Sequence, residues 1–325
     1  MSKKIKNVAK RIIDGDPRLV EIALAQAIDL KDIKAEIDKV NSQISALDRP
    51  RSTVIQTATN EIVVKLFNGQ KIYLDLTDLS VTPHLALDGI WEHEITRAWC
   101  SMLKPESVVL DIGANFGYYG LIASQLINMK KSKVVYFEPN PNLIPLIKKT
   151  LSVNWLVAGS KIENLAISDN TGTAKLSILK DYIGSSSLHT IDHLRGYLED
   201  SMYLEESSVI EVPTTTIDSY CIENNIKNVD LIKLDVEGFE ELAYSGMRKT
   251  VKQSTSPVLF IEFTFNSYEK PKLFFETMKK DFGNLALIDD DGSFIDANRM
   301  TYKEVVGIRD DWIMLVFSKD TIVSK

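Results

Sequence analysis

Residues 108–120 read VVLDIGANFGYYG, and this stretch decides the fold. An apolar strand runs into a turn that carries Asp111, Gly113, Asn115 and Gly117, and a helical pattern follows. Glycines in such a strand–turn–helix unit let the backbone pass close to a ligand and adopt torsions that are closed to other residues. The helix that follows directs free amides at the same point. We therefore expect a nucleotide-type ligand at this turn, with these four residues as candidate cofactor-binding residues.

The next apolar strand ends in a carboxylate that fits the same ligand. The stretch VVYFEPNP, residues 134–141, places Glu138 at the strand tip, where an acid can accept the two ribose hydroxyls of a nucleoside. The turn reads DIGANFG rather than GxGxxG, so it lacks the packed glycines that cradle a pyrophosphate. S-adenosylmethionine (SAM) has no phosphate, and its charged amino acid end suits Asp111. The sequence thus favours SAM over NAD, although the glycines alone would also suit a plain tight turn.

An ordered series of motifs resembles the FkbM-type SAM-dependent methyltransferases. Together they cover about residues 85–265, and they are DGIWEHEIT (88–96), the glycine turn, VVYFEPNP, ENLAISDNTGTAKL (163–176), VPTTTIDSY (212–220), VDLIKLDVEGFE (229–240) and VLFIEF (258–263). The resemblance implies a class I methyltransferase fold that methylates a hydroxyl oxygen, commonly on a sugar of a glycan or on a natural product. It also implies an adenine contact from Asp169, for which the alternative is a plain turn-forming residue.

Methyl transfer to an alcohol needs a base, and four residues are candidates for the catalytic group. Asp235 follows an apolar strand and is the first candidate base, with Glu237 second. Lys233 lies two residues before Asp235 and so shares its face, where its charge would hold the carboxylate ionised. The alternative is a structural ion pair at the strand end. His189, in the GSSSLHT loop, is the third candidate base, against the reading of a solvent-exposed loop histidine. We expect no required metal.

The order of elements predicts an α/β fold with a Rossmann-like, mostly parallel sheet. Strands are expected at 107–112, 133–138, 162–167, 229–235 and 257–263, with helices at 117–129, 141–152 and 238–250. The closing ALIDDDGSFI and DWIMLVFS predict the antiparallel pair that ends class I methyltransferase sheets. Ligands in such sheets lie beyond the carboxyl ends of the strands.

Two further segments precede this core. Residues 17–47 predict a helix, and apolar residues from Leu30 to Leu47 follow heptad spacing. This seam indicates either a coiled coil with a second copy of the chain or an amphipathic helix on its own catalytic domain. Residues 52–76 predict a β meander whose last two strands are joined by the two-residue turn Asn68-Gly69. We divide the chain into a helical segment (1–48), the meander (51–84) and a methyltransferase domain (85–325).

Composition limits the partners. The formal charge of −7 and the pI near 5.3 argue against nucleic acid, which basic faces usually bind. Cys100 and Cys221 have neither metal nor redox spacing and suit buried or half-buried thiols. The sequence has no transmembrane segment and no secretory signal at its start, so we expect a cytoplasmic protein that acts on a small molecule or a glycan. Two other hypotheses stay open: an NAD(P)-dependent Rossmann oxidoreductase, and a non-catalytic SAM-binding scaffold assembled by the coiled coil.

Overall fold

The structure is a computed structural model that describes residues 53–127, 133–179, 181–188, 208–309 and 311–322. All of these residues belong to one compact unit, residues 51–325. The expected helical segment at 1–48, with its coiled-coil seam, lies outside the described residues. Within the described ranges, no helix is long and apolar enough to cross a membrane.

The predicted meander is present as a three-stranded antiparallel sheet. Its strands are β1 (Val54–Ala58), β2 (Glu61–Lys65) and β3 (Lys71–Asp75). The hairpin turn is one residue longer than expected, because Leu66 and Gln70 still pair and leave Phe67, Asn68 and Gly69 in the loop. Gly69 has a φ of 85°, which is the usual position of a glycine in a three-residue hairpin loop. Helices α3 (Thr82–Asp88) and α4 (His93–Met102) connect the meander to the core.

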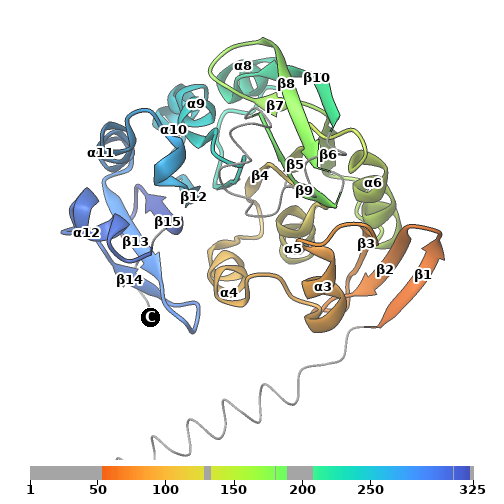
Figure 1. Cartoon of the computed structure of the whole chain (residues 1–325). Coiled ribbons are helices and arrows are strands. Elements are labelled where there is room, and N and C mark those ends of the chain that lie inside the picture. The colour runs from red at the N-terminus through yellow and green to blue at the C-terminus, as the bar shows by residue number, and fades with distance from the viewer. Residues whose placement is uncertain (1–52, 128–132, 180, 189–207, 310, 323–325) are drawn as a thin grey trace, which may run out of the picture. The chain divides into compact units, whose positions relative to one another are not determined.

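The core is one eight-stranded sheet in the order β14-β13-β15-β12-β11-β4-β5-β6 (Figure 1). Five neighbouring strands run parallel, and β15 pairs antiparallel with β12, which confirms the mostly parallel sheet with an antiparallel end. The strands are β4 (Val108–Ile112), β5 (Lys133–Phe137), β6 (Ser160–Glu163), β11 (Leu231–Leu234), β12 (Val258–Phe263), β13 (Asn284–Ile288), β14 (Phe294–Asp296) and β15 (Ile313–Ser318).

Helices cover both faces of this sheet because its central strands are apolar on both sides. Alternate residues of β4 enter different cores: Val109 packs with one cluster and Leu110 with the other. The helices are α5 (Tyr118–Leu126), α6 (Ile144–Val153), α8 (Ile217–Glu223), α9 (Glu240–Ser245), α10 (Arg248–Gln253), α11 (Pro271–Phe282) and α12 (Tyr302–Val306), with a 3-10 turn η2 at Phe265–Ser267. The thiols match expectation, since Cys221 is buried, Cys100 is half-buried, and both are free.

Two expected elements are divided in the structure. The predicted strand 162–167 ends in the main sheet as β6 at Glu163, and β7 (Ala166–Ile167) belongs to a second sheet. That sheet has the order β7-β10-β8-β9, with β8 (Gly172–Leu179), β9 (Tyr182–Ser187) and β10 (Ser208–Thr215), and the sequence did not predict it. The predicted helix 238–250 breaks near Gly246, where an added Cβ would lie 2.0 Å from the Ser168 carbonyl oxygen.

Candidate active site

A cleft lies at the carboxyl ends of β4, β5 and β11, where the topology predicts a ligand site. Its empty volume, which includes space open to solvent, is about 890 Å³. The glycine turn, the tip of β5, strand β9 and the loop after β11 supply its walls. The structure therefore brings the glycine motif and the LDVEGFE motif, more than a hundred residues apart, into one site.

The glycine turn has the backbone that its sequence demands. Gly113, Asn115 and Gly117 have φ values of 78°, 54° and 82°. An added Cβ on Gly113 would lie 1.7 Å from the carbonyl oxygen of Asp235, so only glycine lets β4 and β11 approach here. Gly113 and Asn115 line the cleft, whereas Gly117 precedes α5 and is not among the lining residues.

Glu138 joins the tips of the first two core strands. Its carboxylate accepts hydrogen bonds from the backbone amides of Asn115 and Asn140, each at 2.7 Å. Burial raises the pKa of Glu138 to about 7, although these two amides favour the charged form. A carboxylate has about four lone-pair sites, so two remain for further donors. Glu138 lines the cleft, and its contact with ribose hydroxyls stays a prediction.

Asp111 is placed differently from the prediction. It lies on the same face of β4 as Val109, beneath α5, and its carboxylate accepts a hydrogen bond from the Gly120 amide at 2.7 Å. This contact satisfies one of the free amides in the first turn of the helix. Asp111 is fully buried and is not among the cleft-lining residues. The structure thus gives Asp111 a role in fixing the turn, and its contact with the amino acid end of SAM stays a prediction.

Asp169, the candidate for the adenine contact, lies outside the residues that line the cleft. It is exposed and bonds to the side chains of Ser168 and Asn170. The physical reason is the division of the expected strand, which carries the chain away from the main sheet after β6. The neighbouring residues that do line the cleft are apolar, and they are Leu165, Ala166 and Ile167.

Lys233 and Asp235 meet as their two-residue spacing predicts. The Lys233 ammonium lies 2.7 Å from Asp235 Oδ2, and only 1% of the Lys233 residue is exposed. Burial opposes its charge, but Asp235, Glu92 and Glu262 outweigh this and raise the pKa of Lys233. Asp235 lines the cleft with about a quarter of its side chain accessible, at 26%. A carboxylate held by a permanent cation is therefore available to a ligand.

Further acids surround this pair. Glu237 lines the cleft with a φ of 55°, and its carbonyl accepts a hydrogen bond from the Ser187 hydroxyl. Burial and the charge of Asp235 raise the pKa of Glu262 well above its ordinary value.

Among the residues that the structure describes, no group of three or more His, Cys, Asp and Glu could hold a metal ion. His189 lies outside the described residues, although Leu188, just before it, lines the cleft.

Sequence reasoning missed strand β9 as a wall of the cleft. The carbonyl of Gly184 accepts a hydrogen bond from Asn115 Nδ2 at 3.4 Å, and Asn140 Nδ2 donates to Ser186 Oγ at 3.1 Å. This strand therefore touches the turns after both β4 and β5. A run of glycine and serines is more typical of a loop, so the local sequence carries no signal for this strand.

Comparisons with known proteins agree with this geometry. Residues 111–287 match a family model described as "Methyltransferase FkbM domain". The chain is 24% identical over 188 residues to the 2-O-methyltransferase NoeI of Sinorhizobium fredii, covering 56% of this chain and 71% of NoeI. It is 25% identical over 162 residues to the 31-O-demethyl-FK506 methyltransferase FkbM of Streptomyces tacrolimicus, covering 45% of this chain and 61% of that relative.

Solved structures show looser similarity. A methyltransferase FkbM from Methylobacillus flagellatus has a TM-score of 0.42 and 15% identity, covering 70% of this chain and 49% of that one. TYW2 of P. horikoshii, solved in complex with MeSAdo, has a TM-score of 0.39 and 12% identity, covering 90% and 86%. Because both scores are low, the fold assignment depends on the sheet order and the family match. A domain match over more than half of its residues shows that the chain belongs to the FkbM methyltransferase family.

Proposed function

We propose that the cleft binds SAM and that the protein methylates a hydroxyl group of a small molecule or a glycan. The observation that carries this proposal is the placement of two carboxylates in one cleft. Glu138 lies at the tip of β5, and Asp235 lies beyond the tip of β11, with its charge partner Lys233 beside it. The first can hold a nucleoside, and the second can accept a proton.

The residues present fit SAM better than a dinucleotide. Among the described lining residues, Lys233 is the only Lys or Arg, and it is already paired with Asp235. The negatively charged pyrophosphate of a dinucleotide would meet several carboxylates and no free cation. The positively charged sulfonium of SAM is instead favoured by neighbouring carboxylates. Glu138 would accept the ribose hydroxyls, and Leu165, Ile167 and Phe137 offer apolar contacts to a planar base.

Asp235 is the proposed base. When bound, SAM supplies an electrophilic methyl group on its sulfonium. The task left to the protein is to align the acceptor hydroxyl and to take its proton, and a positioned base contributes about 10² to 10⁴ in rate. The Lys233 ammonium lies 2.7 Å from Asp235 Oδ2 and so holds this carboxylate in place at the cleft. Glu237, on the same loop, is the second candidate.

The acceptor class follows from relatives rather than from the cleft. The names of NoeI and FkbM both specify O-methylation, so a hydroxyl oxygen is the proposed nucleophile here. Carboxylates such as Asp235 and Glu237 also suit a polyhydroxylated ring, because each can accept hydrogen bonds from several hydroxyls. A sugar of a glycan is the acceptor that we test first.

A methyl-transfer screen tests the proposal. The purified protein is incubated with SAM and a panel of nucleotide sugars and oligosaccharides, and mass spectrometry detects a gain of one methyl group. We expect a methylated product, and we expect Asp235→Asn to lower kcat by about 10² to 10⁴ while SAM still binds. Asp290→Asn, on an exposed turn outside the cleft, is the matched control and should retain wild-type activity. Binding of NAD in place of SAM would refute the proposal, and SAM binding without turnover on any acceptor would favour a scaffold.

A further inference from the structure

Glu92 is an acid whose position local helix chemistry does not explain. It precedes helix α4 at the N-cap position, yet its side chain makes no capping hydrogen bond. Its backbone is left-handed, with φ 42° and ψ 68°, a conformation that costs a residue other than glycine free energy. Burial raises the pKa of Glu92, and the Lys233 charge opposes that shift. A strained, partly buried carboxylate that does not serve its own helix indicates another role.

The contact of Glu92 is with the first turn of α5, next to the glycine motif. The Tyr119 hydroxyl donates to Glu92 Oε2 at 2.6 Å. The neighbouring Tyr118 hydroxyl accepts a hydrogen bond from the Trp91 amide at 3.2 Å, which fixes the same backbone turn. Two adjacent tyrosines of α5 therefore hold residues 91 and 92, although more than twenty positions separate the tyrosines from these residues in the sequence.

The Tyr119 ring connects Glu92 to the proposed catalytic pair. The Lys233 ammonium lies 4.9 Å from the centre of this ring, a cation–π distance, and 2.7 Å from Asp235. Tyr119 and Lys233 both line the cleft, but Glu92 does not. Burial and the Glu92 charge raise the pKa of Tyr119 well above 10, so its hydroxyl keeps the proton that it donates. Tyr119 and Lys233 therefore connect Glu92 to the cleft.

We propose that Glu92 and Tyr119 are positioning residues, which fix the Lys233 ammonium and, through it, orient the Asp235 carboxylate in the cleft. The hydrogen bond holds the ring in place beside the ammonium, and the Glu92 charge attracts the same cation. This inference rests on the proposed function for the role of Asp235, but its structural part does not. Other charged or titratable groups near the pair are Asp111 on β4, Glu237 and Glu240 after β11, and Glu262 on β12.

A second cluster of the same composition, at the β5–β6 edge of the sheet, supplies matched controls. The Tyr220 hydroxyl donates to Glu163 at 2.9 Å, and the Lys161 ammonium lies 5.1 Å from the centre of the Tyr220 ring. Lys161 also pairs with Glu163 at 2.6 Å. None of these three residues lines the cleft. Glu163→Gln and Tyr220→Phe therefore remove the same groups from side chains that do not line the cleft, and Tyr220→Phe keeps the ring that packs against Phe137.

The test needs no acceptor substrate. The probe is the side-chain ammonium of Lys233, observed by nitrogen NMR in ¹⁵N-labelled full-length protein and assigned with Lys233→Met. Glu92→Gln keeps a hydrogen-bond acceptor but removes the negative charge, whereas Tyr119→Phe keeps the aromatic ring and the Glu92 charge. We expect each variant to speed the exchange of the Lys233 ammonium protons with water by about tenfold or more. Glu163→Gln and Tyr220→Phe should leave the signal unchanged. Wild-type exchange in both Glu92→Gln and Tyr119→Phe would overturn the inference.

Activity separates this inference from the proposed function. With an acceptor from the screen, both variants should lower kcat by about tenfold, with KM for SAM within about twofold of wild type. The double variant should lose no more than the worse single variant, because the two residues act as a unit. Unchanged kcat in both variants, while Asp235→Asn is inactive, would overturn the positioning role and leave the function standing. Full activity of Asp235→Asn would instead refute Asp235 as the base.

Discussion

At the scale of the residue, Glu138 connects the two turns that form the cofactor end of the cleft. Each of its carboxylate oxygens accepts one backbone amide, from Asn115 and from Asn140. The sequence predicted its place at the strand tip, because strand direction and chain order fix which residue comes last. It did not predict that Asp111 turns under α5, because this depends on which sheet face the helix covers.

Glu138→Gln should weaken SAM binding by about 10- to 100-fold. The glutamine side chain has only one oxygen, so its NH₂ group would face one of the two backbone amides, of Asn115 or Asn140, that the wild-type carboxylate accepts. The negative charge that favours the ribose hydroxyls is also lost. Calorimetric titration with SAM measures the change. Glu163→Gln, near the tip of the adjacent strand β6 but outside the cleft, is the control. Equal SAM affinity in Glu138→Gln and wild type would show that Glu138 does not bind the cofactor.

At the scale of the element, local order predicted the main sheet but not the second one. Each strand–turn–helix unit of the core is contiguous in sequence, so its pattern of polarity is visible in one window. Strand β7 has two residues, and its parallel partner β10 lies almost fifty positions later. Such pairing is set by tertiary contacts and leaves no local signature. Strand β9 pairs with the preceding strand β8, and it was missed because its run of glycine and serines is typical of a loop.

Strand β9 should depend on Gly184. An added Cβ at this position would lie 2.6 Å from Asn115 Nδ2 and 3.1 Å from Ser80 Oγ. Gly184→Ala should therefore push β9 away from the glycine turn and raise KM for SAM by about tenfold, a loss similar to that of one polar contact. Gly172→Ala on β8, where the nearest atom would be 3.7 Å away, is the control. A wild-type KM in Gly184→Ala would mean that β9 does not shape the cofactor end.

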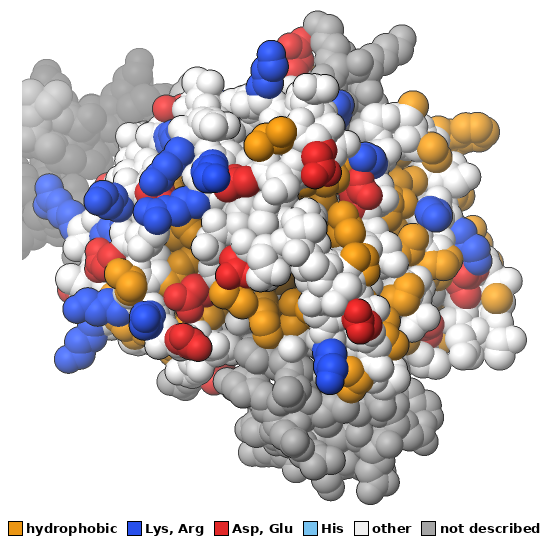
Figure 2. Space-filling model, turned by 90° about the horizontal axis from the view of Figure 1, so that it is seen from above, with side chains coloured by type: hydrophobic (Ala, Val, Ile, Leu, Met, Phe, Trp, Pro, Cys, Tyr) orange, Lys and Arg blue, Asp and Glu red, His pale blue; other side chains and the backbone are white. Residues whose placement is uncertain are grey.

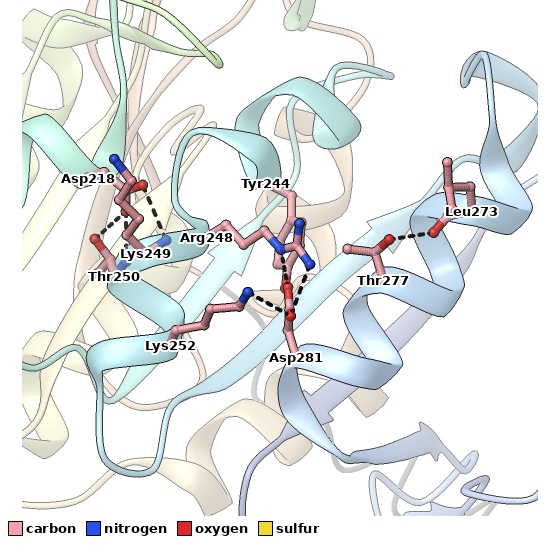
Figure 3. A network of polar contacts seen from close by, with 9 residues as sticks. All are labelled: Asp218, Tyr244, Arg248, Lys249, Thr250, Lys252, Leu273, Thr277 and Asp281. Atoms are coloured by element: carbon pink, nitrogen blue, oxygen red, sulfur yellow. Dashed lines mark hydrogen bonds and ion pairs between the residues drawn. The ribbon is translucent and has the colours of Figure 1, made fainter.

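Helices α10 and α11 are held together by a buried carboxylate outside the site (Figure 3). Asp281 on α11 accepts hydrogen bonds from the Arg248 guanidinium and from the Tyr244 hydroxyl, and only 3% of its side chain is exposed. Asp281→Ala should lower the free energy of unfolding by about 1–3 kcal/mol, because these donors lose their partner. Thr277→Ala, which loses a single bond to the Leu273 carbonyl on exposed helix surface, should cost far less. Chemical denaturation measures both, and equal losses would refute the role of Asp281.

At the scale of the whole molecule, positive and negative side chains are mixed on the face that Figure 2 shows. The formal charge is −7, as a substrate other than nucleic acid would suit. The acids that matter most for stability are buried: burial raises the pKa values of Asp111, Glu138 and Glu240 to about 7 each.

These raised values predict that the ligand-free protein loses stability as pH rises. A buried carboxyl whose pKa is higher in the folded than in the unfolded protein contributes its full stability below the unfolded pKa, near pH 4. This contribution is lost as the pH rises through the folded pKa of about 7. A tenfold difference in acid dissociation constant between the folded and unfolded states corresponds to about 1.4 kcal/mol. Thermal unfolding should therefore give a lower Tm at about pH 8 than at about pH 5.5, by several degrees.

Glu240→Gln provides the control for this pH dependence. The variant keeps an oxygen acceptor for the Val236 amide, which Glu240 binds at 2.8 Å, but it cannot titrate. Its Tm should fall less between the two pH values than that of wild type. Burial raises the pKa of Asp281, but Arg248 outweighs this effect and lowers that pKa below its ordinary value. The Arg248–Asp281 pair therefore loses its contribution to stability only at more acidic pH. A Tm that rises from about pH 5.5 to about pH 8 would contradict the raised pKa values.

A calorimetric titration of the full-length protein with SAM, with NAD titrated in parallel, tests the cofactor site most directly. We expect heat from one SAM molecule bound per chain, weaker binding by Glu138→Gln, and no binding of NAD. Saturable binding of NAD, or no heat from SAM with folded wild-type protein, would contradict the claim that the cleft at the tips of β4 and β5 holds this cofactor.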